Sequence, residues 1–206
     1  MKLNYFDLGL YKGTEIKWMT QKIFPRLGIE NYSAYGFDAC RKYTKGLSRY
    51  YSSNERVKIE HLAISGEEKT IRLYHSKNAV GHSIYSTKQN VEQDSFEEAP
   101  AMRFSKWAAE NDINLKSSFN IMKINIEGAE WPLFQDLVST KLIKDIDIFC
   151  GAGHDIKKVG ELNEVVDDYY KLLEDHNVHF YRFTEYRPSK NDNLLQLIRK
   201  KYMENV

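Results

Sequence analysis

The sequence has few cysteines, no excess of charge of either sign and no long apolar run. Cys40 and Cys150 are its only cysteines, and they lie too far apart for a disulfide framework or a compact metal site. Its 30 basic and 29 acidic residues give a net charge of +1, which provides no global field to attract nucleic acid or an anionic membrane. No run approaches the ~18 apolar residues of a membrane helix. We therefore expect no membrane insertion and no nucleic-acid partner.

The composition is typical of an ordinary globular domain. Apolar residues make up 42% of the chain and charged residues 29%, with only 4 prolines. No linker or internal repeat divides the 206 residues, so we expect a single domain over 1–206, which could also be one domain of a larger protein. Asp7 interrupts the first apolar stretch too early for a secretory signal. Together with the reduced cysteines, this predicts a cytoplasmic location.

Short apolar strands alternate with helical patterns along the chain. Such alternation predicts βαβ units around a mostly parallel sheet, with ligands bound beyond the carboxyl ends of the strands. Residues 70–74 alternate in a way that predicts a hairpin with the third strand, and 194–198 fit either a seventh strand or the start of a last helix. The expected strands are 3–8, 33–38, 57–64, 119–126, 146–150 and 179–183, and the expected helices are 14–27, 40–51, 104–110, 132–138 and 158–175.

An acid stands near the end of the first strand and two glycines follow it, at Asp7, Gly9 and Gly13. Gly9 would let the backbone turn tightly and approach a ligand, and Gly13 would allow close packing where the next helix begins. The spacing is neither that of a dinucleotide fingerprint nor that of a P-loop. An ordinary strand-to-helix turn explains it equally well.

Asp38 ends the second strand, about 25 residues after the glycine turn. An acidic side chain at that place can accept hydrogen bonds from both ribose hydroxyls of a bound nucleoside. It can also cap the helix that follows. The two roles are compatible.

Residues 123–130, KINIEGAE, closely resemble the KIDIEGAE signature of the FkbM-type methyltransferases. Other family marks follow in order: the glycine turn resembles motif I of the class I S-adenosylmethionine-dependent methyltransferases, and counterparts of later motifs stand at 36–38, 62–65 and 81–83. The resemblance covers residues 3–183. It departs from the family in motif I, where Gly9-Leu10-Tyr11 replaces the usual Gly-Ala-Asn, and at Asn125, which replaces the signature Asp.

This resemblance implies a Rossmann-like class I fold, an α/β arrangement with a mostly parallel seven-stranded sheet and helices on both faces. It implies S-adenosyl-L-methionine as cofactor and O-methylation of a sugar or glycan hydroxyl. The hydroxyl of a small metabolite or of an RNA ribose is an alternative acceptor, and a non-catalytic S-adenosylmethionine-binding module is the alternative of another class. The cofactor-binding candidates are Asp7, Gly9, Leu10, Tyr11, Lys12, Gly13, Asp38, Ala63, Ile64 and Ser65.

The catalytic candidates are His154, Glu127 and Asn125. Asn125 cannot take a proton at neutral pH, so His154, which follows the fifth strand and two glycines, is the expected base. Alternatively, His154 is an ordinary surface histidine without a catalytic role. Glu127 can hold a substrate hydroxyl, act as base or orient His154, but both it and Glu130 also suit the first turn of a helix. Lys123 alternates with Asn125 and can pair with an acid.

The polar segment 75–100 is expected to cover the acceptor. The substrate-binding candidates are His82, Ser83, Tyr85 and Asp155. Asn125, Glu127, His154 and Asp155 could together ligate Mg²⁺, but no tight ligand spacing demands a metal, so a divalent cation is possible and not favoured.

Overall fold

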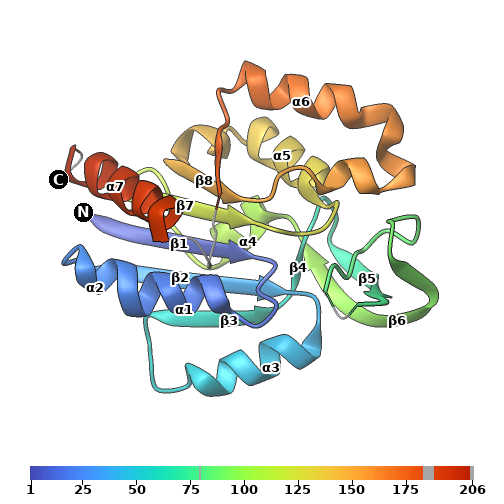
Figure 1. The fold of residues 1–206 in the computed structure, drawn as a ribbon, viewed down its shortest axis with the longest axis horizontal. Helices are drawn as coiled ribbons and strands as arrows, with labels where there is room; N and C mark the ends of the chain where they lie inside the picture. The colour runs from blue at the N-terminus through green and yellow to red at the C-terminus, as the bar shows by residue number, and fades with distance from the viewer. Residues whose placement is uncertain (79, 183–187, 205–206) are drawn as a thin grey trace.

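The centre of the fold is a six-stranded parallel sheet, seen in a computed structural model that describes residues 1–78, 80–182 and 188–204 (Figure 1). Its strand order is β3-β2-β1-β7-β8-β9, and all five pairings are parallel. The strands are β1 (Lys2–Leu8), β2 (Tyr32–Asp38), β3 (Val57–His61), β7 (Ser118–Ile124), β8 (Ile148–Gly151) and β9 (Phe180–Tyr181). The order reverses between β1 and β7, and ligands bind at such a switch point in open α/β sheets.

Helices cover both faces of this sheet. One face carries α1 (Thr14–Trp18), a π-helical turn (Met19–Ile23), α2 (Phe24–Arg26), α3 (Arg41–Tyr50) and α7 (Pro188–Glu204). The other carries α4 (Phe104–Glu110), α5 (Glu130–Ser139) and α6 (Val166–Asp175), with 3₁₀ turns at Leu142–Asp145, Asp155–Lys158 and Gly160–Val165. No helix in the described part of the chain has the length and apolar character needed to cross a bilayer.

The two central strands are buried along almost their whole length. Every residue of β1 after Lys2 is buried, and so is every residue of β7 after Ser118. Strands covered on both faces are usually apolar, and the polar residues here have partners: Asn4 Nδ2 donates to Asn120 Oδ1 at 2.9 Å. The register sets Asp7 directly opposite Lys123.

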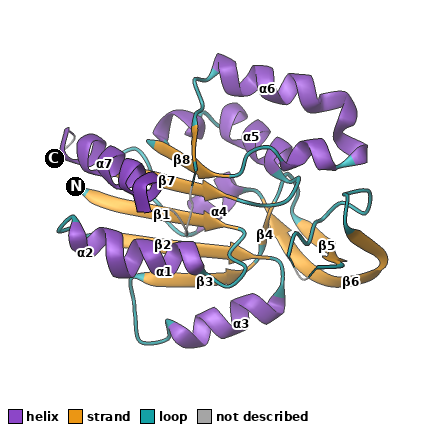
Figure 2. Ribbon diagram, in the orientation of Figure 1, coloured by secondary structure: helices purple, strands orange, loops and turns teal. Residues whose placement is uncertain are grey.

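A second, three-stranded sheet adjoins the first and has the order β4-β6-β5 (Figure 2). It consists of β4 (Ala63–Ile64), β5 (Lys69–Ser76) and β6 (Val91–Met102), and the two long strands form an antiparallel hairpin. The predicted pairing of 70–74 with the third strand is therefore wrong. The expected third strand ends at His61 in the main sheet, and the chain resumes at Ala63 in the second sheet. Residues 91–100, expected to be loop, belong to β6.

The predicted parallel α/β sheet with helices on both faces is confirmed, but it has six strands in the described residues. Residues 194–198, left open between strand and helix, lie in α7, where Leu194, Leu195 and Ile198 are buried at helical spacing. The expected helix over 158–175 begins as 3₁₀ turns and becomes α-helical at Val166. Of the expected strand 179–183, residues 180–181 form β9, and Phe183 lies outside the described residues.

Candidate functional site

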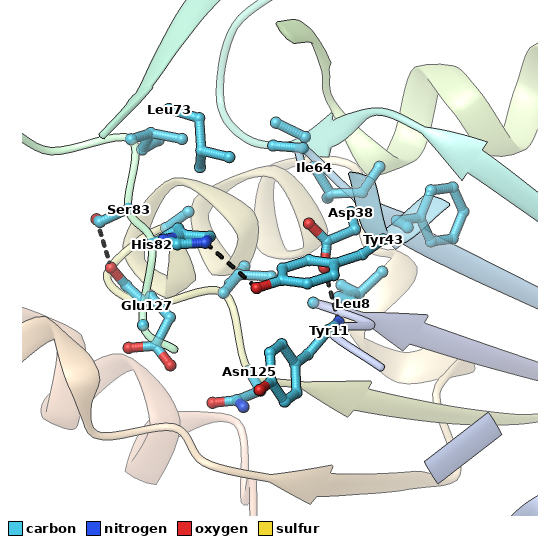
Figure 3. A pocket seen from close by; sticks show the side chains of 18 of the residues that line it. Leu8, Tyr11, Asp38, Tyr43, Ile64, Leu73, His82, Ser83, Asn125 and Glu127 are labelled. Atoms are coloured by element: carbon cyan, nitrogen blue, oxygen red, sulfur yellow. Dashed lines mark hydrogen bonds between the residues drawn. The ribbon is translucent and has the colours of Figure 1, made fainter. Parts of the chain in front are cut away.

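A cavity opens where β1, β2, β4 and β7 end, and the segment 80–84 borders it (Figure 3). Its apolar walls include Leu8, Phe37, Ile64, Leu73 and Ile126. Polar groups converge on it from different elements: Asp38, Tyr43, His82, Ser83, Asn125 and Glu127. Apolar walls with a few converging polar groups are typical of small-molecule sites.

Gly9 forms a tight turn at the end of β1. Its φ is +86°, and a Cβ at this position would lie 1.9 Å from the carbonyl oxygen of Asn125. The backbone N–H groups of Gly9 and Leu10 both donate to the carbonyl oxygen of Phe37, at 2.9 and 3.1 Å. Only glycine fits this turn, because any side chain would collide with the neighbouring strand end.

The Asp38 carboxylate is fixed at the end of β2 by two backbone donors. Its oxygens accept hydrogen bonds from the N–H groups of Tyr11 and Cys40, each at 2.8 Å. Burial raises the pKa of Asp38, and these two hydrogen bonds oppose the rise. A carboxylate has about four lone-pair positions, so Asp38 can hold the turn before α3 and still accept hydrogen bonds from a ligand. The expected cap is not formed by Asp38: Cys40 is the N-cap of α3, and no side chain caps the helix.

His82 and Tyr43 form a polar pair on the cavity wall. His82 Nδ1 accepts a hydrogen bond from the N–H of Ser76 at 2.8 Å, so the ring proton resides on Nε2, which lies 3.4 Å from the Tyr43 hydroxyl. Burial, and then the nearby His75, lower the pKa of His82. His82 is thus a neutral donor in this arrangement. Tyr43 was not singled out from the sequence, where it is one of 14 tyrosines without a distinguishing signal.

Glu127 lines the cavity just beyond β7 and is clamped to the segment 81–88. Its backbone has a φ of +56°, its carboxylate forms an ion pair with Lys88 at 2.8 Å, and its carbonyl oxygen accepts a hydrogen bond from Ser83 Oγ at 2.7 Å. Lys88 Nζ also donates to the carbonyl oxygen of Gly81 at 2.8 Å. Sequence reasoning missed Lys88, because a lysine in a polar segment is usually solvated, whereas this side chain is 3% exposed.

Several cofactor-binding candidates do not line the cavity. Asp7 is buried beneath the turn, with Oδ1 2.9 Å from Lys123 Nζ. Asp7 does not line the cavity, because the strand register sets it opposite Lys123. Four others also lie elsewhere: Leu10 in the core, Gly13 against Leu47, Lys12 on the surface, and buried Ser65 beside Glu67. Gly9, Tyr11, Asp38, Ala63 and Ile64 do line the cavity.

His154 does not line the cavity, unlike the other two catalytic candidates, Asn125 and Glu127. Its side chain is exposed and stacks on Tyr170, with Nδ1 3.1 Å from the tyrosine hydroxyl. Gly153 packs against Phe180, and the chain then enters a 3₁₀ turn at Asp155.

Of the predicted substrate contacts, His82 and Ser83 line the cavity, whereas Tyr85 and Asp155 do not. Asp155 is paired with Lys158 instead. The four candidate Mg²⁺ ligands are consequently not brought together. The described residues contain no group of three or more His, Cys, Asp or Glu side chains arranged to hold a metal ion.

Comparison with known proteins identified no relative of this chain. No family model matches it, and searches of curated proteins and of solved structures found no match either.

Proposed function

We propose that this chain binds S-adenosyl-L-methionine in the cavity and methylates a hydroxyl of a sugar or glycan. The observation that carries the proposal is the Asp38 carboxylate, held at the end of β2 and facing a cavity at the switch point of the sheet. The glycine turn at Gly9 borders the same cavity. The reaction and the acceptor class come from the resemblance of residues 123–130 to the FkbM-type signature.

The lining residues fit a nucleoside at one end of the cavity. Asp38 can accept hydrogen bonds from both ribose hydroxyls, while Ala63 and Ile64 supply an apolar wall for a base. The narrow turn at Gly9 lets a ligand approach the backbone closely. When bound, the cofactor supplies a methyl group on a positively charged sulfur.

The other end of the cavity would hold the acceptor. Glu127 is the carboxylate beside Asn125, and its ion pair with Lys88 at 2.8 Å fixes its position at the cavity. In the proposed reaction Glu127 takes the hydroxyl proton while the side-chain amide of Asn125 orients the hydroxyl. This replaces His154 as base.

A non-catalytic S-adenosylmethionine-binding module is the second candidate. It is favoured by Asn125 in place of the signature aspartate and by the ion pair that already engages Glu127. Incubation with S-adenosylmethionine and a panel of glycans separates the two candidates: methylated product supports the enzyme, and binding without turnover across the panel supports the module.

Replacement of Asp38 by alanine is expected to weaken binding of S-adenosylhomocysteine, the product of methyl transfer, at least ~10-fold. Two hydrogen bonds to a charged group would be lost, each contributing about 1.5 kcal/mol or more, and about 1.4 kcal/mol corresponds to tenfold in affinity. Isothermal titration calorimetry measures the change, and thermal melting verifies the fold. Asp168→Ala, at an exposed site on α6, is the matched control. Unchanged affinity in a folded Asp38→Ala protein would exclude the ribose role.

A further inference from the structure

Helix α3 carries a row of cations on its solvent face. Arg41, Lys42, Lys45 and Arg49, which we call the α3 stripe, are all exposed, and α3 contains no acidic residue. Within the described part of the chain, none of the four takes part in an ion pair. The stripe extends along about 12 Å of helix, from the rise of about 1.5 Å per residue.

The neighbouring helix α1 extends this basic surface. Lys17 Nζ lies 4.9 Å from the ring centroid of Tyr50, a side chain that is 55% exposed. Gly46 of α3 is exposed, with no heavy atom within 4 Å of where its Cβ would be. Basic residues outnumber acidic residues by more than two to one between residues 9 and 58, although the whole chain has a net charge of only +1.

The α3 stripe begins at the cavity. Helix α3 follows β2 after two residues (Figure 1), and Tyr43 in its first turn lines the cavity (Figure 3). Lys42 is close enough to His82 to contribute to lowering its pKa. An anionic chain with one unit in the cavity would therefore meet a row of cations as it leaves.

We propose that the acceptor is an acidic glycan whose neighbouring anionic sugars lie along the α3 stripe. This inference rests on the proposed function, because it assigns the glycan end to the same cavity. The row is too long for a single anionic group and suits repeated carboxylates or sulfates. Non-specific binding of single-stranded RNA uses successive bases stacked on aromatic side chains. The exposed aromatic ring beside the α3 stripe is that of Tyr50, and Lys17 already lies over it. A surface of cations with so little free aromatic area suits an acidic glycan better than RNA.

The test compares binding of three fluorescent oligomers: polygalacturonate, neutral dextran of the same length, and poly(U) RNA. We expect the full chain to bind polygalacturonate and not dextran, with affinity that falls as salt rises. The double variant Lys45→Glu/Arg49→Glu should weaken this binding by about tenfold or more, because two attractive charges become repulsive. Lys116→Glu/Lys171→Glu makes the same charge change at exposed sites elsewhere and should stay within about twofold.

Equal binding of dextran and polygalacturonate, or an equal loss in the two double variants, would overturn the inference. Tighter binding of poly(U) than of polygalacturonate would overturn the glycan in favour of RNA. Thermal melting shows whether each variant is folded. The affinity of the unmodified chain for S-adenosylhomocysteine, measured on the same preparation, tests the proposed function separately. If S-adenosylhomocysteine does not bind, the methyltransferase proposal is wrong, whereas the oligomer results decide the role of the α3 stripe.

Discussion

Substitution of Lys123 by methionine is expected to lower the free energy of unfolding by about 3–5 kcal/mol, the range for breaking one side of a buried ion pair. Lys123 Nζ lies 2.9 Å from Asp7 Oδ1, and neither side chain is more than 2% exposed. Methionine has a similar volume and is apolar, so packing is largely retained. The loss comes from the Asp7 carboxylate, which remains buried without its cation.

The same substitution removes a support of the cavity. Lys123 Nζ donates to the carbonyl oxygen of Gly9 at 2.6 Å, which ties the glycine turn to β7. We therefore expect weaker binding of S-adenosylhomocysteine as well as lower stability. Urea unfolding at pH 7 measures the stability, and calorimetry measures the binding.

A double variant shows how much of the lost stability comes from the unpaired Asp7 charge and how much from the lost contacts of Lys123. Asp7→Asn/Lys123→Met removes both charges and should recover more than half of the lost stability, whereas equal losses in the single and double variants would contradict the charge argument. Lys58→Met is the surface control. Its ion pair with Glu60 is 2.7 Å long, but the lysine is 52% exposed, so its removal should lower stability by less than about 1 kcal/mol.

Asp7 and Lys123 show what the sequence could and could not predict about this site. Strand ends are readable from apolar runs, so residues at or just beyond them, such as Gly9, Asp38 and Glu127, could be placed at the correct edge of the sheet. The direction of the Asp7 side chain depends on the register between β1 and β7, two strands separated by more than half the chain. No local pattern encodes that register.

The misplaced elements have similar physical causes. None of residues 91–98 is buried, and a strand with so little burial has no apolar period to distinguish it from a polar loop. His154 was assigned from its position after the fifth strand, but the path of the chain beyond Gly151 is set by packing of Gly153 on Phe180. Lys88 is buried only because the 81–88 segment folds over Glu127.

The protein is expected to lose stability as the pH rises from about 5 to 8, and Glu130 is the largest single cause. Burial raises the pKa of Glu130 to about 8, although the N–H of Gly128 donates to its Oε2 at 2.8 Å. The folded state therefore keeps a proton that the unfolded chain releases near pH 4.5. This retained proton contributes its full stabilisation below pH 4.5, and the contribution is lost as the pH rises through 8. The total loss is about 4–5 kcal/mol, because each unit by which the pKa is raised corresponds to about 1.4 kcal/mol.

Glu130→Gln should flatten this profile, because glutamine keeps an acceptor for the Gly128 N–H and does not titrate. We expect the variant to exceed the unmodified protein most in free energy of unfolding at pH 8, and to differ little from it at pH 5. Burial raises the pKa of Asp7 to about 6, so the stability of the Glu130→Gln variant should still decline as the pH rises, by a smaller amount and at lower pH. Urea unfolding at pH 5, 6, 7 and 8 measures both profiles, with exposed Glu174→Gln as the matched control. Parallel profiles for Glu130→Gln and the unmodified protein would show that Glu130 is already ionised at neutral pH. A buried cation or a hydrogen-bond donor in addition to the Gly128 N–H would then be needed to stabilise the ionised Glu130 carboxylate.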